Sequence, residues 1–276
     1  MRTALLAMAA MVGFAANSLL SRAALRGGEI DAGSFVAIRL ATGALVLALI
    51  VAARRETPRG TGSWGSAAAL AVYAIAFTFA YRELPAGTGA VILFGSVQLT
   101  MVGVGIARGE RPSVLQWIGW LLALTGLVVV NAPGIDPPPA QGAALMFAAG
   151  IAWGVYSLRG RGVQRPLATT ADNFMRTLPL AVVLVTITQV TGAHVSVRGI
   201  ALAAASGGIA SGLGYSLWYA AVPALGATRS AAVQLSVPVI TAVAAMALFG
   251  EALRPTLAIG GGAIIVGLAL ALRTKR

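Results

Sequence analysis

The strongest constraint on the fold is an internal repeat, in which one series of landmark residues occurs twice along the chain. Each copy carries two aromatic residues and a proline at the same spacing, then a Gly-Glu pair and a further glycine. In the first copy these are Phe77, Tyr81, Pro85, Gly109-Glu110 and Gly126; in the second they are Tyr215, Tyr219, Pro223, Gly250-Glu251 and Gly267. Earlier landmarks agree, since Gly13, Arg22 and Arg39 correspond to Gly150, Arg159 and Arg176. We therefore expect two copies of one unit, residues 1–136 and 137–276.

The amino-acid composition indicates that the repeat belongs to a membrane protein. Hydrophobic residues make up 58% of the 276 positions and charged residues only 10%, far below the ~25% charged residues of soluble domains. The chain has no cysteine, so it offers no disulfide framework and no thiolate metal site. The net charge of +12 does not indicate nucleic-acid binding, because the basic residues stand singly or in small clusters between apolar runs.

Ten apolar segments are close to the ~20 residues that a membrane-spanning helix needs. They lie at 3–23, 33–53, 63–82, 87–107, 113–131, 140–159, 171–191, 199–219, 229–249 and 255–272. The sequence thus predicts an all-α polytopic membrane protein with five helices per copy. The third segment, rich in alanine, and the seventh, with Arg176 and Pro179, fit least well. A cleaved signal peptide is an alternative for the first segment, but its landmarks recur in the second copy, which favours an uncleaved helix.

The distribution of lysine and arginine predicts the orientation. With a cytoplasmic N-terminus, most basic residues fall in cytoplasmic segments, as the positive-inside rule requires. Both termini are then cytoplasmic. An odd number of helices per copy turns the second copy upside down, so the architecture is an inverted repeat around a central cavity, typical of alternating-access transporters.

No pattern of catalytic residues is present. The single histidine, His194, falls in an expected loop, and the eight carboxylates lie at or beyond the ends of the spans. We expect no enzyme activity, no metal and no cofactor. The partners expected are the lipid bilayer and a small-molecule substrate, with no nucleic acid and a monomer as the simplest state.

The five-helix units, the Gly-Glu pair that closes each fourth helix and Pro238 upstream of Glu251 together resemble the EamA-type members of the drug/metabolite transporter superfamily. The resemblance covers essentially the whole chain. Within that superfamily the chain looks most like a YddG-type exporter of aromatic amino acids from a bacterial inner membrane. This resemblance implies ten helices around a central cavity and export of aromatic or hydrophobic amino acids and related compounds. One departure is Val97, which stands where the second copy has Pro238, so the fourth helix is expected to be straighter than the ninth.

Candidate cavity residues are mainly aromatic side chains at helical spacing on the third and eighth segments. As pathway residues we select Tyr73, Phe77, Tyr81, Phe94, Trp153, Tyr156, Tyr215, Trp218 and Tyr219. Tyr81 and Tyr219 would act as outer and inner gates. An aromatic belt at the membrane surfaces or a packed helix face explains the same pattern.

Polar residues within spans are costly and therefore informative. Asn17, Gln98 and Gln234 would bind a zwitterion, or alternatively form interhelical hydrogen bonds. Arg39 and Arg176 would either extend to the membrane surface or place a positive charge near each mouth. Glu110 and Glu251 are interpreted as packing or capping residues that pair with loop arginines.

The absence of a carboxylate within the spans argues against exchange of cationic drugs for protons. We therefore expect uniport down the solute gradient. Three alternatives remain: a proton-coupled exporter, a carrier of phosphorylated sugars or lipid-linked intermediates, and a membrane scaffold without transport activity.

Overall fold

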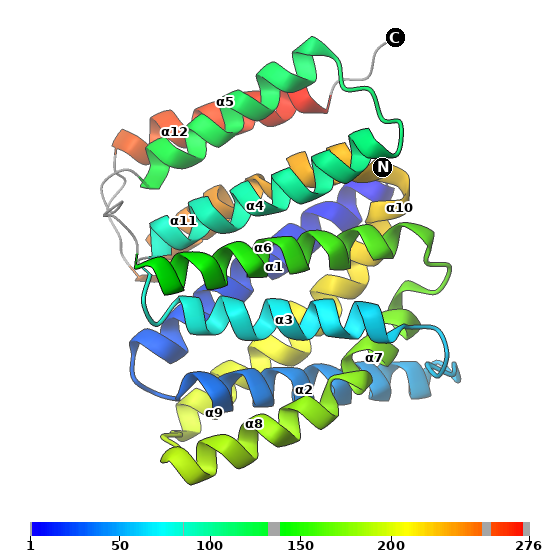
Figure 1. Ribbon diagram of the computed structural model, residues 1–276, viewed down its shortest axis with the longest axis vertical. Helices are drawn as coiled ribbons and strands as arrows, with labels where there is room; N and C mark the ends of the chain where they lie inside the picture. Colours follow the sequence, from blue (N-terminus) through cyan, green and yellow to red (C-terminus); the bar gives the residue numbers. More distant parts are fainter. Residues whose placement is uncertain (1, 85, 132–138, 250–254, 273–276) are drawn as a thin grey trace.

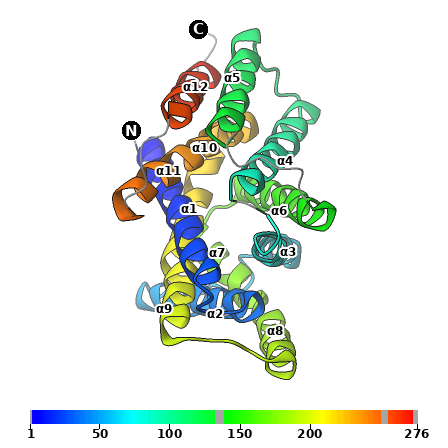
Figure 2. The same cartoon turned by 90° about the vertical axis from the view of Figure 1, so that its left-hand side faces the viewer.

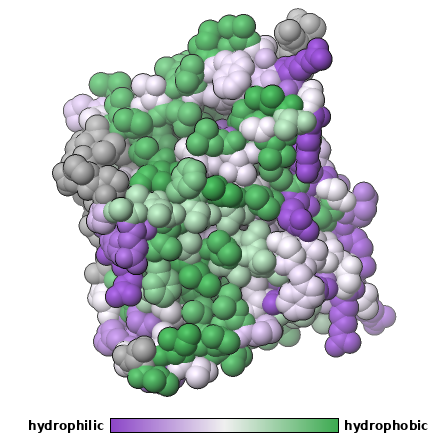
Figure 3. Space-filling view, viewed as in Figure 1, coloured by the Kyte–Doolittle hydropathy of each residue, from purple (hydrophilic) through white to green (hydrophobic). Residues whose placement is uncertain are grey.

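The computed structural model describes residues 2–84, 86–131, 139–249 and 255–272, and within them the regular structure is helical. Six helical runs are long and apolar enough to cross a membrane, and four shorter apolar helices accompany them, which gives the ten segments expected from the sequence. The helices run side by side across the molecule, with polar residues gathered along the right-hand edge of the view and apolar residues over the middle (Figures 1 and 3).

The first half contains five helices that each cross once. They are α1 (Arg2–Arg26), α2 (Ala32–Ala53), α3 (Trp64–Ala80), α4 (Ala86–Ala107) and α5 (Val114–Asn131). Side-chain caps fix two of the starts, because Asp31 accepts a hydrogen bond from the Ser34 N–H and Ser63 accepts one from the Ser66 N–H.

The second half has the same five crossings but more interruptions. Its helices are α6 (Ala140–Arg159), the short η2 (Gly160–Gly162), α7 (Pro166–Arg176), α8 (Leu178–Thr191), α9 (Val197–Ala205), the π-helical η3 (Ser206–Leu213), α10 (Gly214–Gln234), α11 (Ser236–Phe249) and α12 (Pro255–Ala271).

Proline and glycine account for three of these interruptions. The seventh segment begins at Pro166 rather than 171. It breaks at Thr177, because in a continuous helix the ring of Pro179 would clash with a backbone carbonyl of the preceding turn. The eighth crossing continues past 219 and ends at Gly226, whose positive φ of 76° breaks α10. A third break, at Leu235, precedes Pro238, whereas α4 with Val97 is continuous, as the sequence predicted.

The packing of equivalent helices shows that the two halves are inverted. Cβ atoms added at Gly119 and Gly126 of α5 would lie 2.5 Å from the backbone oxygens of Gly267 and Gly260 of α12, so the backbones touch. The lower-numbered glycine of one helix meets the higher-numbered glycine of the other, which makes the two helices antiparallel. Likewise α3 packs on α6 while its counterpart α10 packs on α1. These reciprocal contacts define a two-fold relation between the halves.

Candidate translocation site

A continuous column of aromatic rings runs through the interior. Tyr81 packs edge-on against Phe77 at 4.8 Å between ring centroids, and Phe77 lies 5.4 Å from Tyr73. The column then passes to the second half, because Trp153 of α6 lies 4.8 Å from Tyr73 and 4.7 Å from Tyr215.

The far end of this column is the pair Tyr156 and Tyr219, whose rings stack at 4.7 Å. Tyr219 also donates a hydrogen bond to the Tyr156 backbone oxygen at 2.9 Å. Seven of the rings selected from the sequence therefore form one chain of contacts, Tyr81–Phe77–Tyr73–Trp153–Tyr215 with Tyr156 and Tyr219, and its two ends are repeat equivalents. Six of these side chains are buried and Tyr81 is partly buried against the same core, so they do not form an aromatic belt at the lipid surface.

Two of the selected aromatic residues are not part of this chain of ring contacts. Trp218 is fully buried and donates its indole N–H to Ser157 Oγ at 3.0 Å. Phe94 is partly buried and packs among apolar side chains. Conversely, Phe14 of α1 and Phe174 of α7 contact Tyr215 and were not selected. Neither has an aromatic counterpart in the other copy, so the repeat gave no signal for them.

A cavity of about 780 Å³ reaches the Tyr81 end of the ring column. Its walls are the start of α2, the end of α3 and the end of α8, and it includes the side chains of Tyr81, Arg82 and Glu83. Figure 2 views the molecule from the edge where these helix ends lie. The cavity therefore lies between the two halves and adjoins the ring column on one side of the molecule.

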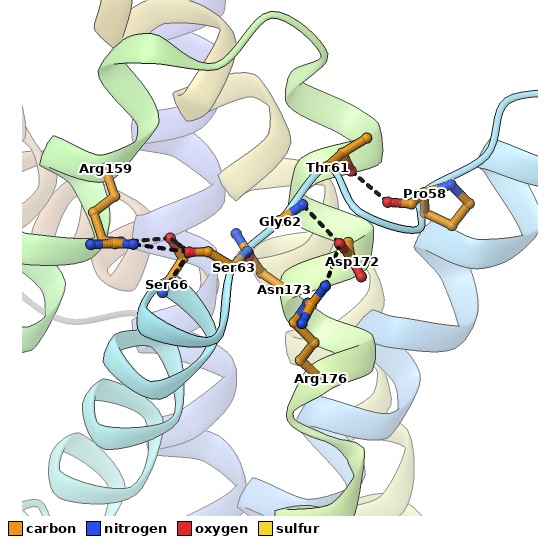
Figure 4. Close-up of polar contacts among 9 residues, drawn as sticks. All are labelled: Pro58, Thr61, Gly62, Ser63, Ser66, Arg159, Asp172, Asn173 and Arg176. Atoms are coloured by element: carbon orange, nitrogen blue, oxygen red, sulfur yellow. Dashed lines mark hydrogen bonds and ion pairs between the residues drawn. The ribbon is translucent and has the colours of Figure 1, made fainter.

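The opposite edge is held together by polar contacts between the halves (Figure 4). The loop before α3 donates backbone hydrogen bonds from Gly62 to Asp172 at 2.8 Å and from Ser63 to Asn173 at 3.0 Å. Arg159 of α6 donates to the hydroxyls of Ser63 and Ser66. These contacts join α3 and the loop before it to α6 and α7 at the Tyr219 end of the ring column.

Glu110 adds a further contact on the same edge. Its carboxylate accepts hydrogen bonds from the backbone N–H groups of Ala227 and Thr228 at 3.0 and 3.1 Å and lies 3.1 Å from Arg161. Burial acts to raise the pKa of this carboxyl, but the two backbone N–H groups and Arg161 outweigh it, so the pKa is held below the ordinary 4.5. Glu110 therefore caps the helix that resumes after Gly226, which confirms its interpretation as a capping residue. Its counterpart Glu251 lies outside the described residues.

The neutral polar residues selected within the spans are engaged between helices. Asn17 accepts from Ser206 at 2.7 Å, Gln98 donates to the Ala231 backbone oxygen at 2.7 Å, and Gln234 accepts from Trp153. The Gln98 carbonyl oxygen is buried and has no hydrogen-bond partner among the described residues. These contacts are interhelical hydrogen bonds, which was the second of the two interpretations of these residues. They leave the carbonyl oxygen of Gln98 without a hydrogen-bond donor among the described residues.

The two arginines differ. Arg176 is half-buried, pairs with Asp172 at 3.2 Å and lies 5.0 Å above the Trp64 ring. Arg39 does not extend to the membrane surface, so that interpretation is wrong: its side chain is 1% exposed. It donates to Ser211 Oγ at 2.9 Å and Tyr215 Oη at 2.6 Å, next to the ring column.

An inverted repeat of five-helix units, with a cavity between the halves that adjoins the interior ring column, is an architecture found in multi-pass membrane transporters. A model of the EamA-like transporter family matches residues 1–132 and 140–273, one match for each half. The chain belongs to the EamA-like transporter family. It is a membrane transporter of small molecules and not an enzyme.

Similar proteins agree with this assignment. An uncharacterized protein of Pseudomonas aeruginosa, PA1977, is 49% identical over 280 residues, which cover 99% of this chain and 96% of that protein. A protein of known crystal structure superposes with a TM-score of 0.76 over 96% of this chain and 97% of its own, at 21% identity, which shows a shared fold.

Proposed function

We propose that the protein exports aromatic or other hydrophobic amino acids and related small compounds by alternating access. The observation that carries this proposal is the ring column that leads from the cavity at Tyr81 to the opposite edge at Tyr219. A cargo with an aromatic ring can replace ring–ring contacts within the column, each worth about 1 kcal/mol beyond burial.

The two edges of the molecule support an alternating mechanism. Hydrogen bonds and ion pairs join the halves at both edges, through Glu29 with Ser196 and Arg198 at one edge and through Asp172, Arg159 and Glu110 at the other. The cavity lies at the first of these edges. In the proposed orientation the N-terminus is cytoplasmic, in a bacterial inner membrane, so the cavity is open to the outside. Rocking of the units 1–136 and 137–276 about their two-fold relation would open the edge opposite the cavity and close the cavity.

Tyr81 and Tyr219 act as the gates in this mechanism. Tyr81 lies between the cavity and the rest of the column, and Tyr219 is its equivalent at the opposite edge. The remaining selected rings would line the path, together with Asn17, Gln98 and Gln234 once their interhelical bonds open. Arg39 and Arg176 would attract the carboxylate of the cargo.

We propose uniport, because no carboxylate of the described residues lies in the ring column where a proton could alternate with a cationic substrate. The test is a counterflow screen in proteoliposomes with the twenty amino acids and a few drugs and sugars. Exchange of phenylalanine, tyrosine or tryptophan supports the proposal, and exchange of sugars or drugs alone contradicts it. Accumulation that follows an imposed pH gradient without a substrate gradient would contradict uniport.

A further inference from the structure

The buried guanidinium of Arg39 is the most unusual electrostatic feature of the interior. Its Nε and Nη2 groups donate to the neutral oxygens of Ser211 and Tyr215, while Nη1 donates to no atom of the described residues. The ion pairs among the described residues involve other arginines, so no described carboxylate lies within ion-pair distance of Arg39. A buried charge without a counter-ion is strongly unfavourable, so this position is suited to bind an anion.

The surroundings of Arg39 are formed by a close contact between α2 and the π-helical η3. The π-helical η3 carries Ser211 to the guanidinium, and a Cβ at Gly207 of η3 would lie 2.2 Å from the Arg39 backbone oxygen. α2 and η3 therefore touch, which only a glycine permits at this point. π-Helical insertions are frequent at functional sites.

The position of the cation relative to the ring column also fits a cargo site. The Arg39 Cζ lies 5.5 Å from the Tyr73 ring centroid, and Tyr215 belongs to the column. Tyr73 is separated from the cavity by Phe77 and Tyr81. A cargo that enters from the cavity and displaces these two rings would meet the guanidinium at the end of an aromatic passage.

We infer that the site around Arg39 binds the carboxylate of aromatic carboxylates that lack an amino group, in preference to aromatic amino acids. In an α-amino acid the ammonium is held within a few ångströms of the carboxylate and would lie near the guanidinium. No described carboxylate is present there to offset the repulsion between the two cations, which is strong in a low-dielectric interior. This inference rests on the proposed function and narrows its substrate class.

Three matched compounds test the inference on the wild-type protein. 3-Phenylpropionate carries a carboxylate only, phenylalanine carries both charges, and phenethylamine carries an ammonium only. Calorimetric titration of the protein in lipid nanodiscs at neutral pH should give a dissociation constant for 3-phenylpropionate about tenfold or more below that for phenylalanine, as expected for one charge-assisted contact. Equal affinities, or tightest binding of phenethylamine, would overturn the inference.

Variants then assign the preference to one residue. Arg39→Gln should remove the advantage of 3-phenylpropionate over phenylalanine, and Arg39→Lys should restore part of it. Arg165→Gln is the matched control, because its guanidinium is partly exposed and already paired with Glu56, and it should keep the preference. A preference unchanged in Arg39→Gln would contradict the assignment. If Arg39→Gln does not fold, as judged by circular dichroism, the wild-type ranking and Arg39→Lys still decide.

The two proposals fail in different ways. Phenylalanine counterflow with no preference for 3-phenylpropionate would overturn the Arg39 inference and leave aromatic amino-acid export standing. Absence of counterflow for every aromatic compound would overturn the proposed function, while binding of 3-phenylpropionate that is lost in Arg39→Gln would still support an anion site.

Discussion

Gly126 of α5 lies directly against the backbone of Gly260 in α12, and the repeat equivalents of these two residues, Gly267 and Gly119, make the same contact in the opposite order. Close packing of small residues is the main source of stability between helices in a membrane, where lipid is as apolar as the side chains. This contact therefore ties the two halves together at the end of the molecule that is farthest from α2 and α8 (Figure 1).

The first prediction follows from this contact. Gly126→Ala should lower the stability of the folded protein by about 2 kcal/mol, typical of overpacking, because its Cβ would lie 2.5 Å from the Gly260 oxygen. Gly262→Ala in α12 is the control, since a Cβ there meets nothing within 4 Å, and it should be neutral or stabilising. Thermal unfolding in detergent micelles measures both; equal unfolding temperatures would show that the α5–α12 contact is not tight.

The second prediction concerns pH. Because the pKa of Glu110 is lowered in the folded protein, its contribution to stability is present above the unfolded pKa and is lost as the pH falls through the folded value. Glu110→Ala should cost about 1 kcal/mol at neutral pH, as for loss of a helix cap, and nothing at strongly acid pH. Thermal unfolding between pH 7 and 3 provides the measurement. Glu56→Ala, which removes an exposed ion pair with Arg165, is the control.

The third prediction tests the proposed gates. Tyr81→Ala should raise the KM for an aromatic cargo about fivefold, the factor that corresponds to the ~1 kcal/mol of one ring contact. Tyr219→Ala should impair transport similarly from the other side. Phe79→Ala is the matched control, because Phe79 lines the cavity and its ring faces Arg82, and no ring–ring contact joins it to the column among the described residues. Wild-type rates in both tyrosine variants, at normal expression, would refute the gate assignment.

The fourth prediction addresses orientation. The chain has no cysteine, so single cysteines can be introduced into the wild-type background. In intact cells His194→Cys should react with a membrane-impermeant maleimide, whereas Thr57→Cys at the opposite edge should react only after lysis. The reverse labelling pattern would place both termini outside and turn the proposed export orientation around.

Much of the fold could be predicted because it depends on local composition. The length of the apolar segments predicted the ten crossings. The presence of Pro238 in the second copy and of Val97 at the equivalent position predicted that the ninth helix is interrupted and the fourth is not. The break at Thr177 depends on Pro179, which was visible, but the start at Pro166 was not, because α7 is amphipathic and too polar to be recognised as part of a span.

The site could be predicted only in part, for a physical reason. Ring spacing on one helix predicts which residues share a face, and this placed most of the aromatic column. Contacts between distant segments leave no such signal: Ser211 reaches Arg39 through the π-helical turn of η3, and Glu110 caps a helix more than a hundred positions away. Arg39 was recognised as a residue of interest, but its burial was not, because surface extension is equally compatible with its position in the sequence.

The single proline of the ninth crossing has one more consequence. The ninth crossing and α4 occupy equivalent positions in the two halves. The ninth crossing is interrupted at Leu235, whereas α4 runs unbroken from Ala86 to Ala107. The two halves therefore differ in helix continuity at this position, an asymmetry that the repeat alone would not give them.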